Sequence, residues 1–183
     1  MSSSQVFRGI GIEMAILLAA GGILHLRSWH LRRLTRPLSL FGALAGLPLF
    51  VAYVLLYWFT AFTVVSAFPA AANAVPLQIV PTASPLVMLV FIVINSIYEE
   101  FAVAGYVITA LSTRNGAAFS ITASTLIRFL YHVYQGPLAS LSILPLGVLF
   151  GVVYWRTRNL WTLVVAHTIA NILTFLVFTQ RAT

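Results

Sequence analysis

The chain has 183 residues, of which 61% are hydrophobic and only 7% are charged. A soluble domain carries about 25% charged residues, so this composition excludes a water-soluble fold and indicates an integral membrane protein. The absence of cysteine excludes disulfides and thiolate chemistry. The net charge of +7 comes from basic residues that stand mainly between apolar runs, which indicates membrane topology rather than nucleic-acid binding.

Six apolar runs follow one another along the chain, and each is long enough to cross a bilayer as a helix of roughly 20 residues. The runs are 10–26, 38–67, 86–111, 117–134, 138–154 and 160–178. Asn115-Gly116 and Gly136-Pro137 are typical turn dipeptides at two of the connections. The sequence therefore predicts an all-α polytopic membrane protein, a bundle of about six transmembrane helices forming a single domain over residues 1–183.

The arginines predict an orientation for this bundle. If the runs alternate across the bilayer, seven arginines share one side: Arg27, Arg32, Arg33, Arg36, Arg114, Arg156 and Arg158. Only Arg8 and Arg181 fall on the other side. The positive-inside rule then places the loops 27–36 and 156–158 in the cytoplasm. We expect the first run to be a retained helix rather than a signal peptide, because no small-residue cleavage site precedes the basic loop.

A short set of polar residues lies inside the apolar runs: Asn95, Glu99, Glu100, Arg128, His132, His167 and Asn171. Ionisable side chains at bilayer depth are costly, so they mark functional sites by default. Residues four apart share a helix face. The pairs with this spacing are Asn95 with Glu99, Arg128 with His132, and His167 with Asn171. We expect the helices to turn these faces toward a common polar cavity.

A carboxylate, two imidazoles and an amide suit water-mediated acyl hydrolysis, which needs a general base for water and donors for an oxyanion. Other interpretations remain open at this point. The glutamates are also compatible with a structural ion pair to Arg128 or with a proton or ion path in a transporter. His167 and Asn171 are compatible with hydrogen bonds that pack one helix on another.

A metal site is the alternative use of the same residues. Glu99, His132 and His167 are a possible zinc ligand set with an open position for water. The sequence has no His-Glu-x-x-His pair on one helix, and Asn171 suits an oxyanion donor better than a zinc ligand. We therefore expect neither a metal nor another cofactor.

Three segments resemble one known family. Residues 98–106 (YEEFAVAGY), 129–136 (FLYHVYQG) and 167–171 (HTIAN) resemble the CAAX prenyl protease 2 and bacteriocin-processing family (CPBP, also called ABI) of intramembrane endopeptidases. That family carries EExxxR, FxxxH and HxxxN/D motifs on successive helices, in this order. The resemblance covers a protease-like core at about residues 86–178.

The resemblance implies an all-helical membrane protease of the glutamic type that hydrolyses a peptide bond of a membrane-associated protein or peptide. Carried over by motif, Glu99 would activate water with His132, while His167 and Asn171 would stabilise the oxyanion. The remaining polar residues, Glu100, Arg128 and Asn95, would support the site. The partners implied are the substrate and the lipid bilayer, without nucleic acid.

The chain departs from the family pattern at two positions. Ala104 stands where EExxxR ends in Arg, and Arg128 stands where FxxxH begins with Phe. We predict that Arg128 replaces the missing arginine and pairs with Glu100 from the neighbouring helix. A transporter and a catalytically silent member that binds a membrane partner are the alternatives, although no internal symmetry or paired broken helices indicate a transporter. Counting the helical rise places Glu99 near mid-membrane and His132 toward the outer end of its helix.

Overall fold

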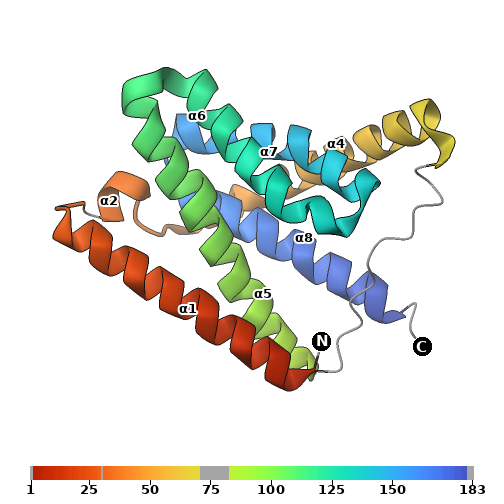
Figure 1. The fold of residues 1–183 in the computed structure, drawn as a ribbon, viewed down its shortest axis with the longest axis horizontal. Coiled ribbons are helices and arrows are strands. Elements are labelled where there is room, and N and C mark those ends of the chain that lie inside the picture. The colour runs from red at the N-terminus through yellow and green to blue at the C-terminus, as the bar shows by residue number, and fades with distance from the viewer. Residues whose placement is uncertain (1, 30, 71–82, 181–183) are drawn as a thin grey trace.

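The structure, a computed structural model, describes residues 2–29, 31–70 and 83–180. All regular elements of this part of the chain are helices (Figure 1), which confirms the predicted all-α class. In order they are α1 (Ser3–Leu26), α2 (Leu31–Leu34), α3 (Leu40–Leu44), α4 (Gly46–Ala67), α5 (Pro85–Glu99), the π-helix η2 (Glu100–Ile108), α6 (Thr109–His132), the short 3₁₀ turn η3 (Val133–Gln135), α7 (Pro137–Thr157) and α8 (Leu160–Gln180). Arg181, placed by the sequence on the less basic side, lies outside the described residues.

Five helical stretches of the described residues are long and apolar enough to cross a membrane: Ser3–Leu26, Leu40–Ala67, Pro85–Gln135, Pro137–Thr157 and Leu160–Val177. The third has 51 residues and contains two of the six predicted runs. Gly116 separates them, with a φ of 77° and a ψ of 178° that a glycine adopts without strain. At this bend the chain reverses (Figure 1), so the turn predicted at Asn115-Gly116 is present.

Local sequence sets several of the helix ends. The side chain of Ser84 accepts a hydrogen bond from the amide of Val87, and Pro85 occupies the first turn of α5. Pro137 similarly begins α7, since proline lacks the amide proton that a first turn leaves unpaired. Arg158 ends α7 in the left-handed conformation, with a φ of 51°.

The π-helix η2 interrupts the α5–α6 stretch at the second glutamate. Wide helical turns of this kind occur mainly at functional sites. Two side chains from neighbouring helices contact its carbonyl groups: Ser124 Oγ donates to the oxygen of Val103 over 2.8 Å, and the hydroxyl oxygen of Tyr154 lies 3.2 Å from the oxygen of Gly105. The hydrogen bond from Ser124 of α6 satisfies a backbone carbonyl of the π-helix.

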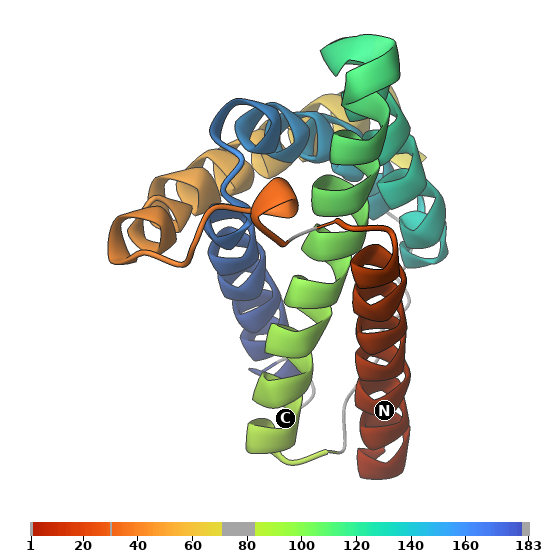
Figure 2. The ribbon, with the colours of Figure 1, turned by 90° about the vertical axis from the view of Figure 1, so that its left-hand side faces the viewer.

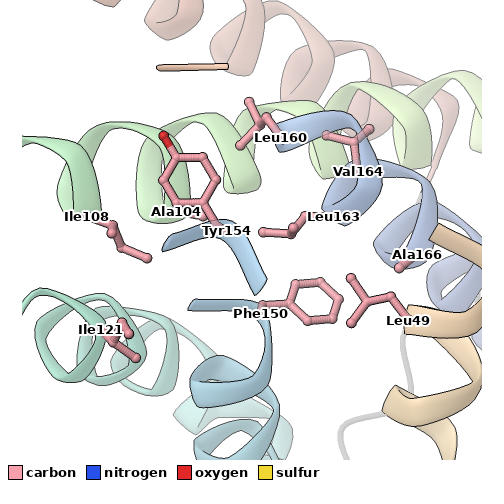
Figure 3. Close-up of a cluster of buried hydrophobic side chains, with 10 residues drawn as sticks. All are labelled: Leu49, Ala104, Ile108, Ile121, Phe150, Tyr154, Leu160, Leu163, Val164 and Ala166. Atoms are coloured by element: carbon pink, nitrogen blue, oxygen red, sulfur yellow. The ribbon is translucent and has the colours of Figure 1, made fainter. Parts of the chain in front are cut away.

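The main hydrophobic core lies where α4, η2, α6, α7 and α8 meet (Figure 3). Its members are Leu49, Ala104, Ile108, Ile121, Phe150, Tyr154, Leu160, Leu163, Val164 and Ala166. The helix α5 lies between α1 and α8 (Figure 2), and α1 stands at the edge of the bundle. The core therefore supports the helices that carry the polar residues, while α1 packs mainly on α5.

Candidate active site

Glu100 lies at the centre of the polar cluster, at the junction of α5 and η2, and is fully buried. Arg128 of α6 binds it with both ends of its guanidinium: Nη1 donates to Oε1 and Nη2 to Oε2, each over 2.9 Å. The predicted pair between Arg128 and Glu100 is thus present in the structure. Ala104 is 1% exposed and packs in the hydrophobic core, so that position leaves no space for an arginine.

His167 of α8 also binds Glu100. Its Nδ1 lies 2.7 Å from Glu100 Oε1. Because a carboxylate paired with Arg128 can only accept, Nδ1 of His167 carries the proton of this hydrogen bond. The Phe150 ring of α7 contacts both partners, with its centroid 5.7 Å from the Arg128 guanidinium and 6.5 Å from the His167 ring. Both carboxylate oxygens of Glu100 therefore accept hydrogen bonds from neighbouring side chains.

Glu99 stands in a different environment from its neighbour. Its Oε2 accepts a hydrogen bond from the hydroxyl of Tyr131 over 2.7 Å and lies 3.9 Å from Nη1 of Arg128. Its Oε1 accepts no hydrogen bond from any described residue, and the side chain keeps 14% of its surface exposed. One oxygen of Glu99 is consequently available to a water molecule.

His132 lies beside Tyr131 at the end of α6, with the two ring centroids 4.5 Å apart. Its Nδ1 is 2.8 Å from the carbonyl oxygen of Arg128. A carbonyl can only accept, so Nδ1 carries a proton and Nε2 of the neutral ring is an acceptor. Nε2 of His132 is therefore an available hydrogen-bond acceptor beside Tyr131, the residue that binds Glu99.

The expected difference in depth between Glu99 and His132 is wrong. Glu99 stands seventeen residues before Gly116 and His132 sixteen residues after it, so the two lie at similar distances from the bend. The apolar run ends at residue 111, whereas the helical stretch continues to the bend at Gly116, so the run does not mark the end of the helix. The contact between Tyr131 and Glu99 shows the resulting alignment of the two helices.

The two asparagines are placed differently. Asn171 lies one turn after His167 on α8, is half-buried, and makes no side-chain hydrogen bond with the described residues. Asn95 was expected to support the cluster but lies outside it. Its Nδ2 instead donates to Oε1 of Glu13 on α1 over 2.9 Å. Asn95 and Glu99 share a helix face, but the Asn95 side chain binds Glu13 and the Glu99 side chain binds Tyr131.

Metal-ligand geometry is not assembled around these residues. Among the described residues, no group of three or more histidine, aspartate or glutamate side chains is placed to hold a metal ion. Nδ1 of His132 faces a backbone carbonyl and Nδ1 of His167 faces Glu100. Each of these two histidines therefore keeps Nε2 as its free ring nitrogen.

The sequence analysis missed two residues of the site, Tyr131 and Phe150. Tyr131 lies within the second matching segment, directly before His132, and a tyrosine hydroxyl inside an apolar run requires a partner. This need for a hydrogen-bond partner is the feature of the sequence that could have indicated Tyr131 as a site residue. Phe150 is one of many aromatic residues in apolar runs, and nothing in the sequence distinguishes it.

A sequence model of the family described as type II CAAX prenyl endopeptidase Rce1-like matches residues 81–173, just over half of the chain. The chain belongs to this family. Membership makes it an integral membrane protein of a protease family, whose members act on membrane-associated proteins. No curated protein and no solved structure matched the chain.

The family match includes every helix that contributes to the cluster around Glu100. It begins just before α5 and ends two residues after Asn171. It excludes α1, and with it Glu13. The Rce1-like part of the chain is thus the part that carries the candidate active site.

Proposed function

We propose that the chain is a glutamic-type intramembrane endopeptidase, in which Glu99 is the general base. The observation that carries this proposal is the contrast between the two adjacent glutamates. Both oxygens of Glu100 are bound by Arg128 and His167, whereas Glu99 retains an oxygen without a described partner. Of the two glutamates, only Glu99 has an oxygen free to take a proton from water.

In this proposal Glu99 and His132 activate the attacking water together. Oε1 of Glu99 takes one water proton, while Nε2 of His132 accepts a hydrogen bond from the other and orients the oxygen. Tyr131 holds Oε2 of Glu99 in place throughout. The water oxygen then adds to the scissile carbonyl carbon.

His167 and Asn171 receive the oxyanion that forms. The side-chain N–H groups of Asn171 donate to no described residue, and Asn171 lies one turn from His167 on the same helix. Nδ1–H of His167 donates to Glu100, so His167 contacts the oxyanion through a proton on Nε2 when both ring nitrogens carry one. When the carbon–nitrogen bond breaks, the proton held by Glu99 passes to the leaving amine, and the other product is a carboxylic acid.

We further propose that the protein works as a single domain without a metal or another cofactor, and that the loops 27–36 and 156–158 face the cytoplasm. Asn171 supports the absence of a metal, because an amide one turn after His167 suits an oxyanion donor better than a zinc ligand. The excess of arginines on one side supports the second.

Incubation of the protein in lipid nanodiscs with a peptide library, followed by mass spectrometry, tests the proposal. We expect defined cleavage products from the wild type. Their rate of formation should fall by about 10² or more in Glu99→Gln, which keeps the side-chain shape and removes the base. A wild-type rate in Glu99→Gln, or activity that is lost on chelation and restored by zinc, would contradict the proposal.

A further inference from the structure

A lateral groove lies between α1 and the α5–η2 stretch, outside the cluster around Glu100. The two helices pack tightly near their N-terminal ends, where Val6 is fully buried and a Cβ added to Gly9 would lie 3.1 Å from the Phe91 ring. Toward the end of α1 they diverge (Figure 1). The space between them is a cavity of about 290 Å³, lined by residues of both helices and by Trp29.

Specific contacts join the two sides of this groove near both of its ends. One turn before the narrow end, Asn95 Nδ2 donates to Glu13 Oε1 over 2.9 Å. At the wide end the rings of Trp29 and Tyr106, which both line the groove, lie 5.9 Å apart. The groove therefore lies between two points at which the fold holds its two sides together.

The walls of the groove are apolar along a length that matches one leaflet of a bilayer. The side chains that line it between the two ends include Ile16, Leu17, Ala20, Ile23, Phe101 and Ala102. On α1 the lining extends from Ile16 to Arg27, which is about 16 Å at a rise of about 1.5 Å per residue. Half of a hydrocarbon core of about 30 Å is about 15 Å.

The wide end of the groove carries positive charge. Arg27 lines it, and the guanidinium of Arg33 lies 5.4 Å from the centroid of the Trp29 ring. Neither arginine forms an ion pair with a described residue. Arginine and tryptophan together are typical of the depth at which lipid headgroups lie.

We propose that this groove binds one acyl chain of an anionic membrane phospholipid, whose phosphate is held at Arg27. The apolar walls fit the chain, the length fits a single leaflet, and the unpaired guanidinium groups fit a negative headgroup. The bound lipid would fill the space between α1 and α5 and so fix the position of α1, the least buried of the membrane-spanning helices. The proposal does not depend on peptidase activity.

Native mass spectrometry of the purified, delipidated protein tests the proposal, with phosphatidylglycerol and phosphatidylcholine of identical acyl chains as probes. Ala20→Phe fills the groove, and Ala19→Phe is the matched control because Ala19 is exposed and does not line the groove. We expect tight phosphatidylglycerol binding by the wild type and by Ala19→Phe, and its loss in Ala20→Phe.

The headgroup contact is tested by a second pair of variants. Arg27→Gln should lower the preference for phosphatidylglycerol over phosphatidylcholine about fivefold, since a basic residue near an anionic lipid contributes about that factor. Arg114→Gln, an exposed arginine near the Gly116 bend, should leave the preference unchanged. Equal phosphatidylglycerol binding by Ala20→Phe and Ala19→Phe would overturn the proposal. So would equal effects of Arg27→Gln and Arg114→Gln, or wild-type protein that binds phosphatidylcholine as tightly as phosphatidylglycerol.

Discussion

At the scale of single residues, two adjacent carboxylates acquire different chemistry from the helices that face them. Glu100 meets Arg128 and His167, while Glu99 meets Tyr131. The pairing of Arg128 with Glu100 could be predicted from the sequence, because Ala104 removes one arginine from the family pattern and position 128 adds one. Tyr131 was not predicted, because a tyrosine in an apolar run is most often a packing residue.

Tyr131 should act as a positioning residue for Glu99. Tyr131→Phe keeps the ring against His132 and removes the hydrogen bond to the carboxylate. Hydrogen bonds to charged groups contribute about 1.5–3 kcal/mol, so we expect kcat to fall by roughly 10- to 100-fold while KM is unchanged. Tyr134→Phe is the matched control, since Tyr134 is 57% exposed and, among the described residues, its hydroxyl hydrogen-bonds only with Gln135. A raised KM with an unchanged kcat would show that Tyr131 contacts substrate instead.

The Arg128–Glu100 pair should be strongly coupled. Arg128→Met leaves a buried carboxylate and Glu100→Gln leaves a buried guanidinium, so each change should destabilise the protein by about 3–5 kcal/mol. The double variant removes both charges and should cost clearly less than the sum, with a coupling of about 2 kcal/mol or more. Reversible unfolding in detergent measures all three. Additive losses would mean that the two side chains stabilise the fold independently.

At the scale of elements, the helices could be predicted and the π-helix could not. Apolar runs separated by turn dipeptides encode the spans directly, as the Gly116 bend and the start of α7 at Pro137 show. Nothing in the local composition of η2 distinguishes it from an α-helix. Ser124 of α6 donates to one of its carbonyls and the hydroxyl of Tyr154 of α7 lies beside another, so its surroundings include tertiary contacts that the local sequence does not encode.

Tyr154 should therefore stabilise η2. Its buried hydroxyl donates to the oxygen of Leu34 over 2.6 Å and lies 2.7 Å from Oγ1 of Thr109, besides its contact with Gly105. Tyr154→Phe leaves these groups unpaired in the core and should destabilise the protein by about 1–3 kcal/mol, seen as a lower Tm. Tyr53→Phe is the control, because the Tyr53 ring packs on Phe150 and its hydroxyl makes no hydrogen bond with a described residue. Equal Tm values for the two variants would contradict a role for the hydroxyl.

At the scale of the whole molecule, the reversal at Gly116 and the packing of α8 bring distant segments together. The reversal at Gly116 aligns α6 with the glutamates, and α8 adds His167 from 67 positions beyond Glu100. The sequence predicted that Arg128 meets Glu100, because polar side chains in lipid must find partners, but it placed Asn95 in the same cluster wrongly and did not predict Tyr131. It did not predict their depths, which depend on where each helix bends rather than on where its apolar run ends.

The orientation of the molecule is testable because the chain contains no cysteine. A single cysteine introduced as Ser28→Cys, in the basic loop, should resist a membrane-impermeant maleimide in intact cells. Ser4→Cys, at the exposed start of α1, should react under the same conditions. Labelling in the reverse order would invert the proposed topology.

The central claim is that the two neighbouring glutamates have separate roles, Glu99 in proton transfer and Glu100 in holding the site together. The most direct test compares Glu99→Gln with Glu100→Gln in two measurements: the turnover of a peptide that the wild type cleaves, and the Tm in the same lipid. We expect Glu99→Gln to lose about 10² or more in kcat with a wild-type Tm, and Glu100→Gln to lose stability as well as activity. A Glu99→Gln protein that turns over normally, or a Glu100→Gln protein that is stable but inactive, would contradict it.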